Sequence, residues 1–462
     1  MPKRSLQTNF EINGIWWLPD KENNKVNGTL EYSISDGFTL KVTGNINKVF
    51  NQFGLTTFPI IHGKDSDGEK VTLFENYQIS YKGGIIQENK FQIGFALVGE
   101  YLNLETNYDI SFATINFNLL EEWFGHVPFS AKSTLHREHI KITAPKSKFN
   151  FKVKSIDSFL SCVFIPNLNH NSFTRLNAFY EANLMLKPIE SNKIKWILDR
   201  TRELKYLFTL LVGKPVSFKN IYFVRKGKRE YLELLIHDGF FFYKEDLRPF
   251  EMTAPFSDIK SDFRFIVNKW FDKIDRLKKI CDLFFASQHK PEMFLEFNFI
   301  SLAQALENYY RCFFKGTYIS QNDYDKFCKS FNNFIPKYIP DDLKESLKSR
   351  LKYGNEYSFK NKIIDVLNKL DPVKIESIVG IKKKVALDIK KIRNYFTHYT
   401  ESELSEEQLD KIENTPIVSD YIDRIEAILT AALLFEIGVS EKIIIKKLRS
   451  RYMRKKDSWK VL

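Results

Sequence analysis

Short runs of alternating apolar and polar residues fill the first third of the chain. Residues 28–44, GTLEYSISDGFTLKVTG, contain two such runs on either side of Asp36-Gly37, a dipeptide that suits a tight hairpin turn. The alternation continues in three further segments, 70–84, 90–102 and 109–125. Because short strands at such intervals are typical of sandwiches and barrels, we expect a β-rich sandwich or barrel-like domain over residues 1–160.

The middle of the chain mixes strand and helix periodicity. Residues 193–213 have helical spacing and end at Gly213, which we expect to terminate the helix. Residues 218–239 predict a hairpin that turns at Lys226-Gly227-Lys228, and residues 261–288 return to helical spacing. These patterns predict a mixed α/β region over 161–288.

From residue 289 onward the spacing is that of amphipathic helices. The helical segments are 294–314, 358–370, 382–400, 418–438 and 441–456. Gly438 is expected to end the fourth of them, and Ser440 can cap the last. Short loops between such helices predict an antiparallel helical bundle over 289–462, so the expected fold class is a multidomain α+β protein.

One of these helices carries a polar cluster beside its apolar stripe. The stripe recurs at three- and four-residue steps and consists of Ile389, Ile392, Phe396 and Tyr399. Off the stripe lie Arg393, Asn394, Thr397 and His398. Arg393 and His398 are about 140° apart around the helix, so the arginine must reach across or meet a histidine from another chain. A solvated helix face with no catalytic role is the alternative interpretation.

The net charge of +13 favours an anionic partner, and nucleic acid is one such partner. Cations recur through the tail at 446–460, KKLRSRYMRKKDSWK, with Tyr452 and Trp459 among them, a composition that suits single-stranded RNA. A solvated helix end explains the same composition equally well. The candidate RNA-binding residues are Lys390, Lys391, Lys447, Arg451, Arg454 and Lys455.

Metal, cofactor and membrane signals are not found in the sequence. The four cysteines form no C-x-x-C and fit no zinc pattern, which predicts reduced thiols in a cytosolic protein. KDSDGEK at 64–70 fails as a calcium loop because Phe74 occupies the twelfth position, so a hairpin turn is predicted there. His136 and His139 form no H-E-x-x-H. The N-terminus lacks the apolar core of a signal peptide, and no apolar run approaches the ~18 residues of a membrane span.

The residues around His398 resemble a known family. Arg393, Asn394 and His398 form R-N-x-x-x-H, which is similar to the R-x4-6-H motif of HEPN ribonuclease domains, where a polar residue follows the arginine. SLAQALENYYR at 301–311 resembles the first helix of the ApeA-like HEPN subgroup, including its acidic residue, here Glu307. NGIWWLPDKENNKVNGTLEYS at 13–33 resembles the opening of the domain that precedes HEPN in ApeA-type anti-phage proteins.

The residue types suit RNA cleavage by attack of the 2′-hydroxyl on the neighbouring phosphate. With an ordinary pKa of about 6.5, His398 can act as acid or base near neutrality. Arg393 offers a charged planar fork to phosphate oxygens, and Asn394 can bind the phosphate or orient the imidazole. The expected supporting residues are Glu307, Thr397 and Tyr399. A buried Glu307 needs a partner; Arg393 is the natural one, and a nearby lysine is the alternative.

The resemblance implies a metal-independent endoribonuclease of bacterial anti-phage defence that acts by abortive infection. The single motif in each chain implies a homodimer with a composite site, and the N-terminal region is expected to sense a phage-derived trigger and restrain the nuclease. RNA is the expected partner, with transfer RNA as one candidate, and no cofactor or membrane is expected. The alternative is a non-catalytic HEPN module that binds RNA or a protein.

Overall fold

The computed structural model describes most of the chain. The described residues are 4–47, 56–84, 87–125, 131–133, 140–142, 148–172, 175–237, 247–289, 294–336, 338–398, 404–414 and 416–456. They fall into two compact units, Met1–Asp272 and Lys273–Leu462. Of the boundaries expected from the sequence, residue 160 lies inside a strand and residue 288 near the end of a helix. The division into 1–160, 161–288 and 289–462 stays a prediction.

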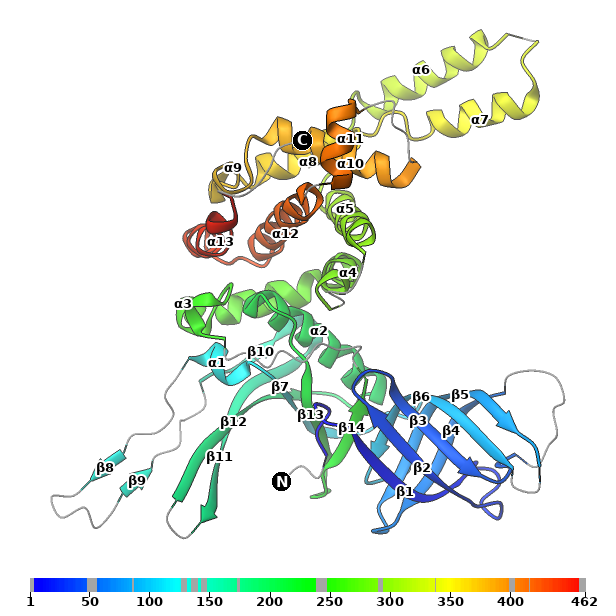
Figure 1. Cartoon of the computed structure of the whole chain (residues 1–462), viewed down its shortest axis with the longest axis vertical. Coiled ribbons are helices and arrows are strands. Elements are labelled where there is room, and N and C mark those ends of the chain that lie inside the picture. The colour runs from blue at the N-terminus through cyan, green and yellow to red at the C-terminus, as the bar shows by residue number, and fades with distance from the viewer. Residues whose placement is uncertain are drawn as a thin grey trace. The chain divides into compact units, whose positions relative to one another are not determined.

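The first unit begins with a six-stranded antiparallel barrel (Figure 1, blue). Its strands are β1 (Phe10–Trp17), β2 (Val26–Ser33), β3 (Gly37–Thr43), β4 (Thr57–Asp65), β5 (Lys70–Lys82) and β6 (Glu88–Val98). The order β6-β3-β2-β1-β4-β5 closes on itself because β5 also pairs with β6. Closure pairs the edges that an open sheet would leave exposed. The predicted barrel-like fold of this region is confirmed.

Two predicted turns of the barrel form as expected. Gly37 has a φ of 79° at the start of β3, where the chain turns back from β2. Gly68 has a φ of 86° between β4 and β5, in the segment that resembles a calcium loop. There the Asp65 carboxylate accepts backbone N–H bonds from Asp67 (3.0 Å) and Glu69 (2.7 Å). KDSDGEK is therefore a hairpin turn whose aspartate is used by its own backbone.

The sheet continues beyond the barrel through β14, which pairs with β6. Together the described strands form one twelve-stranded sheet in the order β10-β11-β12-β7-β13-β14-β6-β3-β2-β1-β4-β5. The added strands are β7 (Ile110–Phe117), β10 (Asn150–Val153), β11 (Ser158–Ser172), β12 (Arg175–Pro188), β13 (Phe218–Arg225) and β14 (Leu232–Ile236). A separate hairpin pairs β8 (Ala131–Ser133) with β9 (Ile140–Ile142). The predicted hairpin of β13 and β14 is confirmed, with Gly227 at a φ of 76°.

Helices cover part of this sheet and anchor it with aromatic rings. The helices of the first unit are α1 (Leu120–Phe124), α2 (Ile194–Val212), α3 (Phe256–Ile259) and the start of α4 (Phe263–His289), with 3-10 turns at Lys154–Ile156 and Pro249–Glu251. Trp123 of α1 is fully buried, 4.9 Å from the ring of Phe208 on α2. As predicted, α2 ends at Gly213, which has a φ of 77°.

The second unit is helical (Figure 1, yellow-green to red). Its helices after α4 are α5 (Leu295–Phe313), α6 (Gln321–Phe334), α7 (Asp341–Leu351), α8 (Phe359–Lys369), α9 (Glu376–Val379), α10 (Lys382–His398), α11 (Glu406–Asn414), α12 (Ile417–Glu436) and α13 (Glu441–Lys456), with a 3-10 turn at Asp371–Val373. Helices α5, α8, α10 and α12 form the core: α5 contacts the other three, and α8 also contacts α10. The predicted helical bundle is confirmed.

Four helices of this unit lie outside the helical segments predicted from the sequence: α9, α11 and the pair α6 and α7. Tyr324 is the one buried residue that the structure describes in α6, and α7 has none among its described residues. In Figure 1 both helices extend away from the core helices. Since they bury so little, their sequences show a weaker constraint from packing than those of α5 or α12.

A buried carboxylate ties the end of α12 to three other helices. Glu436 is 7% exposed. It accepts hydrogen bonds from Lys273 Nζ of α4 (2.6 Å) and the Tyr309 hydroxyl of α5 (2.9 Å), and it also contacts Lys369 of α8.

Among the described residues, no helix combines the length and hydropathy that a membrane crossing requires.

Candidate active site on α10 of the helical bundle

The packing of α10 separates an apolar stripe from the polar cluster, as predicted. Ile389 and Ile392 are fully buried. The ring of Phe396 lies 5.9 Å from that of Phe299 on α5. The polar residues lie off this stripe: Arg393 and Asn394 are half-buried, whereas Thr397 and His398 are exposed. Tyr399, the fourth member of the expected stripe and an expected supporting residue, lies outside the described residues.

Arg393 is held in place by the two neighbouring helices. Its Nη2 atom lies 3.7 Å from Glu307 Oε2 of α5. Its guanidinium carbon lies 5.1 Å from the ring centre of Phe359, the first residue of α8. The expected contact between Glu307 and Arg393 is therefore confirmed. The side chain is still 35% exposed, so part of the planar fork remains accessible to a phosphate.

Glu307 binds more than one cation, so the lysine alternative is confirmed as well. Its Oε1 atom accepts hydrogen bonds from Lys362 Nζ (3.1 Å) and Arg311 Nη2 (3.3 Å). Burial raises the pKa of Glu307, but the hydrogen bond from Lys362 and the charges of Lys362, Arg311 and Arg393 together lower it below its ordinary value. The carboxylate therefore stays ionised. Its single negative charge is shared by three cations, so it does not fully neutralise the charge of Arg393.

His398 ends α10 and is exposed. It lies five positions after Arg393, which corresponds to about 7.5 Å along the helix and 140° around it. Arg393 is directed to Glu307 and Phe359 on α5 and α8. One turn of helix separates Asn394 from His398, and the Thr397 hydroxyl donates to the Arg393 carbonyl oxygen over 2.7 Å. In one chain, the Arg393 guanidinium and the His398 imidazole therefore lie near the same end of α10 but on different sides of it.

The candidate RNA-binding residues differ in their accessibility. Lys390 and Lys391 on α10 are half-buried, and Lys391 Nζ donates to Gln408 Oε1 of α11 over 3.1 Å. Arg451 on α13 is half-buried. Lys447 is 7% exposed, so little of this residue is accessible to a phosphate. The side chains of Arg454 and Lys455 lie outside the described part of the chain.

Stacking of Tyr452 on RNA, which the sequence left open beside a solvated helix end, is contradicted by burial. This side chain is 1% exposed and packs inside the bundle, so its ring cannot stack on an RNA base. The helical periodicity of α13 places it on the buried face. Trp459, the other aromatic residue of the tail, lies outside the described residues.

Cysteine and metal chemistry are not evident in the described structure. Burial raises the pKa of the Cys162 and Cys281 thiols, because both side chains are enclosed in the protein interior. Within the described ranges, no cluster of three or more His, Cys, Asp and Glu residues is arranged to hold a metal ion. His136 and His139 fall outside those ranges.

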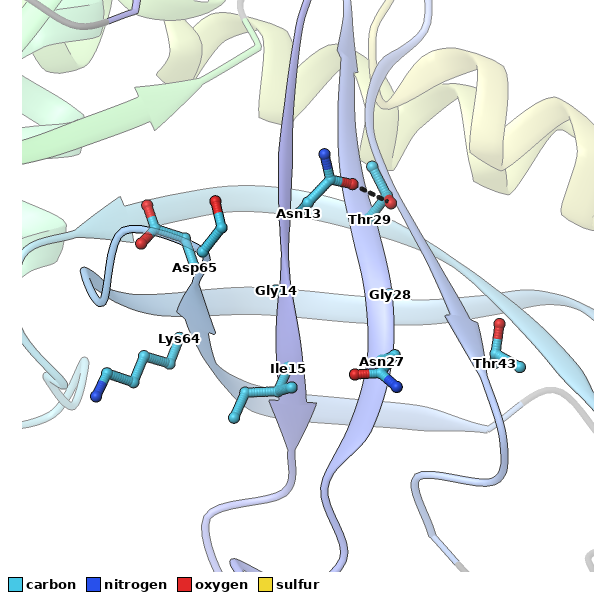
Figure 2. Close-up of a pocket in the computed structure, with 10 residues that line it drawn as sticks. Asn13, Gly14, Ile15, Asn27, Gly28, Thr29, Thr43, Lys64 and Asp65 are labelled. Atoms are coloured by element: carbon cyan, nitrogen blue, oxygen red, sulfur yellow. Dashed lines mark hydrogen bonds between the residues drawn. The ribbon is translucent and has the colours of Figure 1, made fainter.

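Sequence reasoning missed a groove on the outside of the barrel (Figure 2). Gly14 of β1 pairs with Gly28 of β2, and the two form a floor without side chains. Around it stand polar residues, including Asn13 and Thr29, whose side chains are joined by a hydrogen bond of 2.6 Å, and Lys64 of β4. The cavity measures about 550 Å³. Two glycines inside strands were the sequence signal for a close approach of this kind.

A second missed feature lies beside the motif itself. The start of α5, the end of α10 and the end of α11 enclose a groove of about 490 Å³. Aromatic side chains from α10 and from the start of α5 line it. Three sequence segments contribute to this groove, so no single stretch of sequence predicts it.

Comparison with known families matches both parts of the chain. Residues 11–270 match the family model described as ApeA N-terminal domain 1, and residues 300–443 match the one described as Apea-like HEPN. The helical unit that carries Arg393 and His398 is thus a HEPN domain. Because the N-terminal match covers more than half of the 462 residues, the chain belongs to the ApeA family. No curated protein and no solved structure shows a significant match.

Membership of this family makes the chain an anti-phage defence protein with a HEPN domain. HEPN domains are typically ribonucleases, and they commonly dimerise and bind RNA. The predicted family, domain order and fold class are confirmed. The catalytic, supporting and RNA-binding roles of individual residues stay predictions.

Proposed function

We propose that this protein is a metal-independent endoribonuclease whose site is built around Arg393, Asn394 and His398. The observation that carries the proposal is the arrangement of α10: a half-exposed arginine held by Glu307 and Phe359, followed by an exposed histidine at the helix end. In this proposal cleavage of cellular RNA, with transfer RNA as a candidate, halts growth of the infected bacterium. The N-terminal unit would sense a phage-derived trigger and restrain the nuclease in the cytoplasm.

The chemistry assigns one task to each residue. His398 removes the proton of the 2′-hydroxyl or delivers a proton to the leaving 5′-oxygen, because imidazole works in both directions near neutrality. Arg393 binds the phosphate oxygens on which negative charge develops, and Asn394 binds the phosphate or orients the imidazole. The 2′-oxygen forms the new bond to phosphorus as the bond to the 5′-oxygen breaks, so water is not needed in this step.

The first expected result concerns the products. Purified full-length protein should cleave total RNA in the presence of EDTA and leave cyclic phosphate or 3′-phosphate ends. DNA of the same sequence should survive, because it lacks the 2′-hydroxyl that serves as nucleophile. End-group analysis of the fragments and gel electrophoresis measure both outcomes. Loss of cleavage on chelation, or fragments with 3′-hydroxyl ends, would exclude this mechanism.

A dimer of HEPN domains would supply a second imidazole, which the motif of one chain lacks. In-line cleavage benefits from both a base and an acid, whereas the motif provides one imidazole per chain. Arg393 and His398 also occupy different sides of α10, as described above. We therefore propose a two-fold dimer of HEPN domains in which both copies of Arg393 and His398 line one groove.

Mixed dimers test the composite site. A dimer of one wild-type and one His398→Ala chain, isolated with two affinity tags, should cleave at well below half the wild-type rate, because each reaction uses an imidazole from both subunits. The rate of RNA cleavage per dimer is the measurement, and wild-type dimers with the same two tags are the control. Half activity in the mixed dimer, or an active monomer in sedimentation, would show that each chain cuts alone.

The alternative is a HEPN domain that binds RNA or a protein partner without cutting. The ion pair of Arg393 with Glu307 is the observation in its favour, because such a pair also has a purely structural use. RNA binding without any cleavage by the wild-type protein would favour this alternative.

A further inference from the structure

The groove beside the motif is lined by four aromatic side chains, two of which are largely exposed. Phe294, directly before α5, is 74% exposed, and Phe297 in its first turn is 63% exposed. Their ring centres are 6.4 Å apart. Tyr395 and Phe396 of α10, 5.5 Å apart, line the groove as well. Exposed aromatic rings gathered in one concave place are typical of a binding site.

The groove lies next to the proposed catalytic histidine. Thr397, which lines it, directly precedes His398 at the end of α10. Its volume of about 490 Å³ falls within the roughly 300–1,000 Å³ of small-molecule sites. A flat group bound there would therefore be adjacent to the place where the scissile phosphate meets the imidazole.

The rim of the groove is acidic, and this decides which part of an RNA chain fits. Glu413 of α11 and Glu296 in the first turn of α5 both line it. Glu413 Oε1 accepts a hydrogen bond from the Tyr395 hydroxyl (2.6 Å), which leaves its other oxygen as a further acceptor. Carboxylates repel a phosphate but accept hydrogen bonds from amino groups. The rings in turn provide faces on which a base can stack.

We propose that this groove binds one unpaired nucleobase with an exocyclic amino group, next to the scissile phosphate of the RNA. Stacking on Phe294, Phe297 and Tyr395 holds the ring of the base, and Glu413 accepts from its amino group. Adenine, guanine and cytosine meet this requirement, whereas uracil does not. This inference rests on the proposed ribonuclease function and names the subsite that would select the cleavage position.

The test uses full-length protein with His398→Ala, so that bound RNA stays intact. The probe is a short single-stranded RNA with one 2-aminopurine, an amino-bearing base whose fluorescence falls on stacking. Binding should quench the probe, and adding Phe297→Ala should remove the quench and weaken binding by about 5- to 100-fold, as expected for one base–aromatic stack. Phe334→Ala, which truncates a phenylalanine that is 82% exposed on α6 outside the groove, is the matched control and should change neither.

A second variant tests the amino group. Glu413→Gln should reduce the preference for RNA with an amino-bearing base over the same RNA with uracil, because the amide has one acceptor oxygen where the carboxylate has two. An unchanged quench in the Phe297→Ala protein, or no RNA binding at all, would overturn the proposal. So would a change from dimer to monomer in sedimentation of that variant, because the groove would then hold a second copy of the chain.

The outcomes separate this inference from the proposed function. If the wild-type protein cleaves RNA and the Phe297→Ala variant retains the quench, the base subsite is wrong and the nuclease stands. If the quench depends on Phe297 but the wild-type protein leaves RNA intact, the base-binding subsite is supported and the proposed ribonuclease function is wrong.

Discussion

His398→Ala should lower the rate of RNA cleavage by about 10²- to 10⁴-fold, the usual cost of removing an acid or base group. The side chain is exposed at the end of α10, and the change leaves untouched the buried residues of that helix, such as Ile389 and Ile392. The variant should therefore fold like the wild-type protein. Initial cleavage rates on one RNA, measured beside the thermal unfolding midpoint, give the comparison.

Leu387→Ala is the matched control for that experiment. Leu387 is 36% exposed and lies on the same helix, eleven residues and about three turns before His398. Its truncation to alanine shortens an exposed side chain of α10 without removing a titratable group, so cleavage should continue at the wild-type rate. A folded and fully active His398→Ala protein would mean that the Arg393–His398 cluster is a solvated helix face with no catalytic role.

Glu436→Ala should produce the largest loss of stability, about 3 kcal/mol in the HEPN unit. Removing the carboxylate leaves the ammonium groups of Lys273 and Lys369 without their shared anion, and breaking a buried pair typically costs 3–5 kcal/mol. We expect the lower end because these lysine side chains are 27% and 29% exposed and therefore partly screened by water. Chemical denaturation followed by circular dichroism measures the shift.

The control for this variant is Glu345→Ala on α7, whose carboxylate is 73% exposed and pairs with Lys348 at the surface. Its removal should leave the denaturation midpoint in place. An equally small shift for Glu436→Ala would mean that the buried cluster does not hold the four helices together.

The same carboxylate predicts a dependence of stability on pH. Burial raises the pKa of Glu436, but the hydrogen bonds from Lys273 and Lys369 and the charges of both lysines lower it below its ordinary value overall. A carboxyl whose folded pKa is depressed stabilises the fold above its unfolded pKa, and this contribution is lost as the pH falls through the folded pKa. The stability difference between wild type and Glu436→Ala should therefore shrink on acidification below the ordinary range of a glutamate.

The local patterns of the sequence determined the elements and the motif. Glycines with positive φ are required where the hairpins turn, so Gly37 and Gly227 could be placed from sequence alone. The spacing of apolar residues in 382–400 likewise predicted which side of α10 is buried and left the Arg393–His398 cluster off it. Both inferences depend on neighbours within a few residues, and such neighbours are visible in a single sequence.

Only the tertiary structure decided which distant segments of the chain meet and what surfaces they form. The pairing of β14 with β6 extends the barrel into a twelve-stranded sheet, and the sequence contains no sign of that pairing. Lys447 belongs to a cationic run, yet packing buries it. The groove beside His398 needs α5, α10 and α11 together. The physical reason is the same in each case: burial and binding surfaces depend on which elements meet, and a polar or aromatic residue looks alike in sequence whether its neighbours cover it or leave it exposed.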